Sequence, residues 1–131
     1  MAPGVTGKPD GEDTRGPRFT VDVRSGPGTV VLALGGELDH DTAGALRDAL
    51  TRGITAGADR ILVDCSDLRF CDSTGLNALL RGRLAAQNAG IRLELVALQP
   101  PVARMFGITG ADTVFRVHAS LEEALGDRRQ R

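Results

Sequence analysis

Short aliphatic runs alternate with segments of helical spacing along most of this chain, and this alternation restricts the possible folds more than any other feature. The runs "TVVLAL", "RILVDC", "IRLELVAL" and "TVFRV" have the length and residue types of buried strands. Strands that are joined through helices usually lie parallel, with right-handed crossovers. The order of these segments therefore predicts an α/β domain with a largely parallel sheet.

An earlier pair of segments predicts a β-hairpin at the start of the fold. Phe19, Val21 and Val23 alternate with polar residues, as in a strand with one solvated face. The turn residues "SGPG" follow, and the next strand, over residues 29–34, is apolar enough to be buried on both faces. The predicted fold class is therefore a single α/β domain with a mixed β-sheet, mostly parallel with an N-terminal antiparallel hairpin, covered by amphipathic helices.

The first two predicted helices have apolar stripes at steps of three and four residues. The stripes consist of Ala43, Leu46, Leu50 and Ile54, and of Leu76, Leu79, Leu80 and Leu84. Asp39 and Asp41 are both placed to cap the first helix or to add charge at its start. Gly90 is expected to end the second helix, because glycine readily adopts the left-handed conformation found there.

The last two predicted helices are short. Pro101 suits the first turn of a helix that reaches Phe106. A fifth strand is expected over residues 113–117. Ser120 and Glu123 have the spacing of a capping box, which places a final helix after them.

The length and composition predict one folded domain between two tails. A chain of 131 residues can bury a core without disulfides or metals. Residues 1–17 are rich in Gly, Pro and charged residues, so we expect a disordered N-terminal tail there. The domain is expected over residues 18–126, followed by a frayed C-terminal tail over 127–131.

The charge and the aromatic content argue against nucleic acid as a direct partner. The formal net charge is -1, and only 3% of the residues are aromatic, with no Trp or Tyr. Neither a basic surface nor a base-stacking surface is therefore expected. No segment approaches the ~20 apolar residues of a membrane span, and the first residues lack the apolar centre of a signal peptide. We expect a cytoplasmic protein that does not bind a membrane.

The two cysteines do not predict a metal site. Cys65 and Cys71 are six positions apart with no histidine between them, which does not match the paired spacing of zinc ligands. We expect both to be buried, reduced side chains, and we expect no metal and no cofactor. No long apolar stripe remains after the core is assigned, so the free protein is expected to be a monomer.

Two polar loops are the best candidates for a functional site. "GGELDHD" follows the second strand and "SDLRFCDSTG" follows the third. In parallel sheets, ligands tend to bind at loops that follow the carboxyl ends of strands. The second loop contains Ser73, and the role of its hydroxyl is the central question.

The simplest role for Ser73 is a helix cap. Either Asp72 or Ser73 can accept hydrogen bonds from the first amides of the following helix, which is worth about 1 kcal/mol. Capping needs only one such residue, however, and Asp72, Ser73 and Thr74 provide three. Gly75 is unfavourable in a first turn by about 1 kcal/mol, which suggests that something approaches the backbone closely there.

A second role is that of a nucleophile. The G-x-S-x-G turn of serine hydrolases is only half matched, because Gly75 is present but Cys71 occupies the other glycine position. A catalytic base is also required. We expect His118 at the surface after a strand, so only His40, in the other candidate loop, is placed to lie near Ser73.

A third role is that of a phosphate acceptor. Phosphate adds ~1.5 to 2 negative charges, which the free amides and the dipole of a helix N-terminus tolerate. The chain has no G-x-x-x-x-G-K loop, and its one lysine, Lys8, lies in the N-terminal tail. A kinase would therefore have to be a separate protein.

Three blocks of the sequence resemble the STAS-domain anti-sigma-factor antagonists of bacteria. They are "GGELDHDTAGALRDAL", "LVDCSDLRFCDSTGLNALL" and "PPVARMFGITGADTVFRV". The resemblance covers about residues 19–125, and its most specific element is D-S-T-G-L between a strand and a helix. It implies a protein without enzymatic activity of its own that binds an anti-sigma factor serine kinase and so releases a sigma factor. The kinase would use Mg-ATP to phosphorylate the serine, and a metal-dependent serine phosphatase would remove the phosphate.

The resemblance also implies roles for particular residues. Ser73 matches the phosphorylated serine, and Asp39 matches an aspartate beside the same interface. The rest of the expected contact surface consists of His40, Asp72, Thr74, Gly75 and Leu76. Thr74 stays open as a minor acceptor. The alternative within this family is a constitutive STAS subunit of a transport or stress-signalling complex.

Overall fold

The computed structural model describes residues 18–127 and shows a five-stranded sheet with helices on both faces. The strand order is β2-β3-β4-β5-β6, in which β2 is antiparallel to β3 and the other neighbours are parallel. The mixed sheet and its N-terminal hairpin confirm the predicted fold class. The predicted N-terminal tail over 1–17 lies outside the described residues, and so does the predicted C-terminal tail over 127–131 except for its first residue, Asp127.

The longest strands of the sheet are the two strands of the hairpin and the strand that follows them. β2 spans Phe19–Gly26, β3 spans Thr29–Leu38 and β4 spans Arg60–Cys71. Both β3 and β4 are longer than predicted, so "GGEL" and "SDLRFC" are strand residues and not loops. Buried side chains at Leu38, Leu68 and Cys71 extend the core along these added segments.

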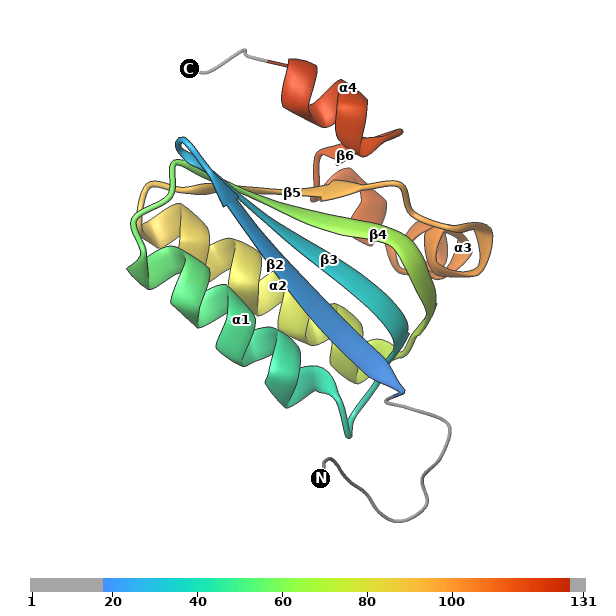
Figure 1. Ribbon diagram of the computed structural model, residues 1–131. Coiled ribbons are helices and arrows are strands. Elements are labelled where there is room, and N and C mark those ends of the chain that lie inside the picture. The colour runs from blue at the N-terminus through green and yellow to red at the C-terminus, as the bar shows by residue number, and fades with distance from the viewer. Residues whose placement is uncertain (1–17, 128–131) are drawn as a thin grey trace, which may run out of the picture.

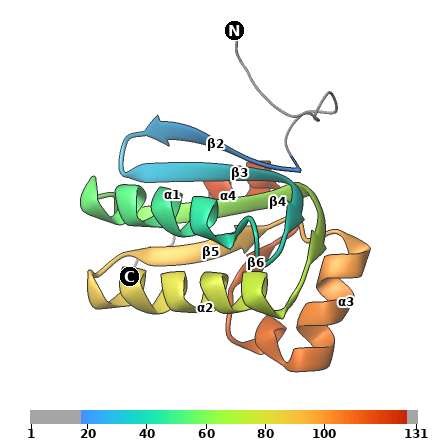
Figure 2. The ribbon, with the colours of Figure 1, turned by 90° about the horizontal axis from the view of Figure 1, so that it is seen from below.

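The two long helices lie side by side on one face of the sheet (Figures 1 and 2). α1 spans Ala43–Thr55 and connects β3 to β4, whereas α2 spans Ser73–Asn88 and connects β4 to β5. Both crossovers are on the same face, and the main hydrophobic core lies between them and the sheet. This arrangement follows from the apolar stripes of the two helices.

The prediction that Leu84 of α2 belongs to the core is wrong. Leu84 is 56% exposed, and the inward positions around it belong to Gly82 and Ala86. A Cβ atom on Gly82 would lie 2.6 Å from the Leu50 Cδ1 atom of α1. The small residues therefore let α1 and α2 approach closely, and this close approach leaves Leu84 outside.

The last third of the chain differs from the prediction in its strands. β5 spans Arg92–Val96, α3 spans Pro100–Thr109, a 3₁₀ turn spans Ala111–Thr113 and β6 is only Val117–His118. The strand predicted over 113–117 is therefore mostly irregular. Phe115 packs on Phe106, with ring centroids 5.9 Å apart, and this contact draws the chain into the core before β6 begins.

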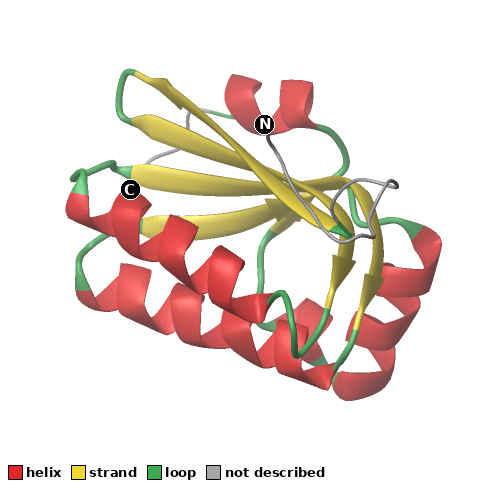
Figure 3. Ribbon diagram, turned by 60° about the horizontal axis from the view of Figure 1, so that its bottom comes forward, coloured by secondary structure: helices red, strands yellow, loops and turns green. Residues whose placement is uncertain are grey.

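Among residues 18–127, a single short helix lies on the opposite face of the sheet (Figure 3). α4 spans Leu121–Gly126, and the Ser120 hydroxyl accepts a hydrogen bond from the Glu123 amide, as the capping-box spacing predicted. Ala124 packs there against a small second cluster, which consists of Val31, Leu62 and Val96. One face of the sheet is therefore fully covered by helices, and the other is covered only in part.

Candidate functional site

The strands β3 and β4 end side by side, and this brings the two candidate loops together. Leu38 pairs with Cys71 at the ends of the strands, and the Asp72 amide donates a 3.1 Å hydrogen bond to the Leu38 carbonyl. The residues that follow β3, beginning with Asp39, therefore lie at the same edge of the sheet as Ser73. The parallel topology predicted this juxtaposition.

Asp72 is the residue that caps α2. Its backbone is extended, and its Oδ1 atom accepts a 2.9 Å hydrogen bond from the Gly75 amide. Ser73 is the first residue of the helix and is exposed, and within residues 18–127 its hydroxyl makes no hydrogen bond. Of the two residues considered as caps, Asp72 alone acts as one, so the Ser73 hydroxyl is available for chemistry.

The start of α2 offers a favourable place for negative charge. The amides of Ser73 and Thr74 belong to the first turn, where the helix itself supplies no carbonyl partner. These amides and the positive end of the helix dipole stabilise a nearby anion. Thr74 is only partly exposed, so Ser73 is the more accessible of the two hydroxyls.

Gly75 and Leu76 face the interior, which corrects their predicted place on the contact surface. A Cβ atom on Gly75 would lie 2.7 Å from the Cγ atom of Leu38 and 2.8 Å from its carbonyl oxygen. The glycine therefore makes room for the end of β3 and not for a partner. Leu76 is 7% exposed and belongs to the main core.

Hydrogen bonds from two backbone amides and from the Arg18 guanidinium hold the carboxylate of Asp39 in place. Its carboxylate accepts bonds from the Asp41 and Thr42 amides, at 3.0 and 3.2 Å, just before α1 begins. The helix itself has no side-chain cap, so of the two predicted roles of Asp39 and Asp41, capping is wrong, and the addition of negative charge at its start stays a prediction. Hydrogen bonds from Arg18 hold the pKa of the Asp39 carboxyl below its ordinary value.

Arg18 belongs to this site although sequence reasoning did not identify it. Its guanidinium lies 2.9 Å from Asp39 and 3.2 Å from Glu37, and its carbonyl accepts a 2.8 Å hydrogen bond from the Glu37 amide. A Cβ atom on Gly36, whose φ is +91°, would lie only 1.9 Å from that carbonyl. The paired glycines at 35 and 36, inside an apolar segment, were the signal for this irregular close contact.

The histidines do not assemble a hydrolase triad with Ser73. His118 was expected at the surface, but it is buried, and its Nε2 atom lies 3.0 Å from the Glu94 carboxylate. His40 is exposed beside Asp39, and no hydrogen bond joins it to Ser73 in the described part of the chain. The base and its orienting carboxylate that a nucleophilic serine needs are therefore not gathered around Ser73.

Comparison with known proteins identifies the family. The model of the family described as "Mlab, STAS domain" matches residues 21–123, which include every strand from the middle of β2 onward. The chain belongs to the STAS domain family. The sequence resemblance to this family is thereby confirmed.

Curated relatives of this STAS domain are anti-sigma factor antagonists. The anti-sigma-F factor antagonist RsfB of Mycobacterium tuberculosis is 30% identical over 107 residues, which cover 82% of this chain and 87% of that protein. The anti-sigma-B factor antagonist of Bacillus subtilis is 29% identical over 104 residues, covering 79% and 94%. The solved structure of SpoIIAA in its unphosphorylated form has a TM-score of 0.68 and 29% identity, covering 82% of this chain and 92% of that one.

Two further expectations concern the cysteines and the helices of this STAS domain. Cys65 and Cys71 are free and buried, and burial raises the pKa of Cys71 to about 12. No group of three or more metal-ligating side chains occurs in residues 18–127. No helix in that range is long and apolar enough to cross a membrane.

Phe70 is a second residue of the site that sequence reasoning did not identify. It lies near the end of β4, pairs in register with Glu37 and is 48% exposed. Aromatic side chains are enriched at protein interfaces, and this one is two positions before the Asp72 cap. Its exposure depends on the extension of β4 through "SDLRFC", which the sequence pattern did not predict.

Proposed function

We propose that this STAS domain is an anti-sigma factor antagonist that works as a phosphorylation switch. Its unphosphorylated form binds an anti-sigma factor serine kinase, which then releases its sigma factor. Phosphorylation of Ser73 ends the complex, and a metal-dependent serine phosphatase restores the binding form. The observation that carries the proposal is the exposed Ser73 hydroxyl, which stands at a helix N-terminus and is not used for capping. The names of the relatives support the antagonist role.

The charges around Ser73 support a switch in binding that leaves the fold intact. Phosphate would add ~1.5 to 2 negative charges beside the carboxylates of Asp72 and Asp39. The amides of the first turn of α2 tolerate this charge, so the domain stays folded. Like charge at a desolvated contact costs several kcal/mol, which is comparable with the roughly 5.5 kcal/mol that reverses a 1:99 population. One phosphate is therefore sufficient for a nearly complete switch.

The proposed contact surface differs from the one expected from the sequence. It keeps Asp39, His40, Asp72, Ser73 and Thr74 and leaves out Gly75 and Leu76, which pack inside the domain. Arg18 and Phe70 are added to it. The sequence has no phosphate-binding G-x-x-x-x-G-K loop, so the partner kinase would bind the ATP that donates the phosphate. A regulator of sigma factors acts where transcription occurs, which places the domain in the cytoplasm.

The switch is tested by capture from a lysate of the native host with four baits. They are the wild type, Ser73→Ala, Ser73→Asp and the control Thr51→Asp, which adds the same charge at an exposed position of α1. The wild type, Ser73→Ala and the control are expected to capture a serine kinase that Ser73→Asp does not. The purified kinase with Mg-ATP should then phosphorylate the wild type, and peptide mass spectrometry should place the phosphate on Ser73.

Other outcomes would reject parts of the proposal. Equal capture of the kinase by Ser73→Ala and Ser73→Asp would reject the switch. Capture of one multisubunit complex by all four baits would indicate a constitutive STAS subunit instead. Phosphate found mainly on Thr74 would keep the switch but move the acceptor.

A further inference from the structure

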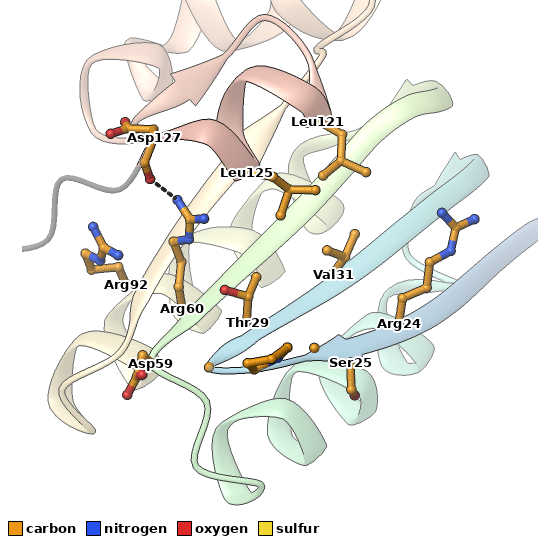
Figure 4. A pocket seen from close by; sticks show the side chains of 13 residues that line it. Arg24, Ser25, Thr29, Val31, Asp59, Arg60, Arg92, Leu121, Leu125 and Asp127 are labelled. Atoms are coloured by element: carbon orange, nitrogen blue, oxygen red, sulfur yellow. Dashed lines mark hydrogen bonds between the residues drawn. The ribbon is translucent and has the colours of Figure 1, made fainter.

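A groove lies on the face of the sheet opposite α1 and α2, between α4 and the turn that joins β2 to β3 (Figure 4). It exists because α4 has only six residues and covers the central strands, where Ala124 packs on Val31. No helix of residues 18–127 covers the neighbouring part of the sheet. The groove has a volume of about 650 Å³, which is within the range of small-molecule sites.

The middle of the groove is apolar, and guanidinium groups lie on either side of this apolar part (Figure 4). Leu121 and Leu125 of α4 face Val31 of β3 across the groove, and Leu125 is 45% exposed. Three arginines also line the groove, namely Arg24, Arg60 and Arg92. A site with an apolar part next to guanidinium groups suits a molecule that has one apolar part and one anionic part.

Arg60 differs from the other arginines because its guanidinium is buried. The residue is 7% exposed, and its Nη1 atom lies 3.3 Å from the Asp127 carbonyl and 3.6 Å from the Glu94 carboxylate. That Glu94 oxygen is shared with His118. A guanidinium has five N–H donors, and within residues 18–127 those of Arg60 make one hydrogen bond. Since buried donors are normally satisfied, Arg60 favours a further acceptor from the groove.

The carboxylates near the groove have contacts other than Arg60. Asp127 forms an ion pair with Arg116, and Asp22, beside the groove, binds Arg24 at 2.9 Å. Asp59 lines the groove with its carboxylate against Gly28 of the turn. Arg60 donates to the backbone carbonyl of Asp127, and within residues 18–127 the carboxylates of Asp22 and Asp59 accept no hydrogen bond from its guanidinium.

We propose that this groove binds a small amphiphilic organic anion, of the alkyl phosphate or alkyl carboxylate class. The anionic group accepts hydrogen bonds from Arg60, and the alkyl part packs against Leu121 and Leu125. The groove begins at Thr29 and the phosphorylation site follows Leu38, so the ten residues of β3 separate them by roughly 30 Å. The ligand therefore does not compete with a partner at Ser73, and the inference stands apart from the proposed function.

The test is a nuclear magnetic resonance titration of the full-length, ¹⁵N-labelled protein with octyl phosphate. We expect the amide signals of Gly28, Thr29 and Leu125 to shift, while that of Ser73 stays in place. Inorganic phosphate lacks the alkyl part, and octan-1-ol lacks the charge. The affinity of each is expected to be at least about tenfold lower than that of octyl phosphate.

Two matched substitutions separate groove binding from adsorption to exposed leucines. Leu125→Asp places a carboxylate in the apolar part at an exposed helix position, and we expect affinity for octyl phosphate to fall about tenfold or more. Leu84→Asp alters an exposed leucine of α2, which is 56% exposed against 45% for Leu125, and we expect no change. Arg60→Lys keeps the charge but loses the forked donors, so it should also weaken binding.

The proposal is overturned if Leu125→Asp and the wild type bind octyl phosphate equally. If octan-1-ol binds as tightly as octyl phosphate, the proposed contact with the anionic group is rejected. If inorganic phosphate binds as tightly as octyl phosphate, the proposed contact with the alkyl part is rejected. Phosphatidylglycerol vesicles provide the last comparison. Sedimentation of the protein with these vesicles, without binding of free octyl phosphate, would indicate a lipid surface and not a groove ligand.

Discussion

The guanidinium of Arg18 binds the carboxylate of Asp39 through two hydrogen bonds, of 2.9 and 3.2 Å, although the residues are 21 positions apart. Arg18 precedes β2 and Asp39 follows β3, so the pair connects the two outer ends of the antiparallel hairpin. The carboxylates of Glu37 and Asp41 lie 3.2 and 3.6 Å from the same guanidinium. One arginine therefore determines how much negative charge this edge of the sheet presents to a partner.

Arg18→Ala is expected to raise the pKa of Asp39 toward its ordinary value, because hydrogen bonds from Arg18 are the main cause of its depression. A depressed pKa contributes stability that is present above the unfolded-state pKa and is lost as the pH falls through the folded-state pKa. The wild type should therefore lose its advantage over Arg18→Ala on acidification from about pH 7 to about pH 2. The ¹³C shift of the Asp39 carboxyl and urea unfolding across this range measure both effects.

The control for this prediction is Arg24→Ala, which removes an arginine of β2 that pairs with a different exposed carboxylate, that of Asp22. It should leave the Asp39 titration unchanged. If both variants shift the Asp39 pKa alike, the effect is one of general charge, and the specific Arg18 contact does not determine it.

Asp72→Ala should lower the free energy of unfolding by about 1 kcal/mol, because the Gly75 amide loses its acceptor at the start of α2. Ser73→Ala should change it by no more than about 0.5 kcal/mol, since the Ser73 side chain is exposed. Urea unfolding of both variants measures the difference. Equal losses would mean that Ser73 shares the capping role.

Gly75→Ala should destabilise the domain by about 1–3 kcal/mol, because the added methyl group meets Leu38 at 2.7–2.8 Å. The matched control is Gly44→Ala in α1, where the nearest atom would lie 3.7 Å away, at the Arg47 guanidinium. That change should stabilise the helix by up to about 1 kcal/mol. Thermal unfolding distinguishes the two, and a neutral Gly75→Ala would show that β3 and α2 can move apart.

Glu94→Gln should cost about 3–5 kcal/mol, because it leaves the buried guanidinium of Arg60 without its carboxylate. Asp48→Asn removes the same charge from an exposed position of α1 and should cost within about 0.5 kcal/mol. Chemical denaturation at neutral pH measures the loss of stability of each variant through its unfolding midpoint. Similar small losses would show that Arg60 finds other acceptors when Glu94 is neutral.

The sequence was sufficient for the architecture because hydrophobic periodicity reports which faces are buried. The alternation at Phe19, Val21 and Val23 placed the hairpin, and the stripes of α1 and α2 placed both crossover helices. From that topology it followed that Asp39 and Ser73 share one edge of the sheet. Local capping was also predictable where one residue pair decides it, as at Ser120 and Glu123.

The errors arose where tertiary packing overrides local patterns. The glycines and polar residues at the ends of β3 and β4 indicated loops, but pairing between the strands continues through Leu38 and Cys71. Leu84 fitted the helical stripe, but the contact of Gly82 with Leu50 turns the buried side of α2 away from it. His118 is buried because Glu94 of β5 provides its partner, and the sequence does not show this pairing.

The two ends of the described chain lie at opposite ends of the sheet, each next to a candidate site. Arg18 contacts Asp39 at the phosphorylation edge, and Asp127 lines the groove. A purification tag or fluorophore fused before residue 18 is therefore attached close to the surface on which partner binding is to be measured. One fused after Asp127 is attached beside the proposed anion site. Binding measurements on this protein accordingly call for tag-free material, or for a label on an exposed position of α1 such as Arg47.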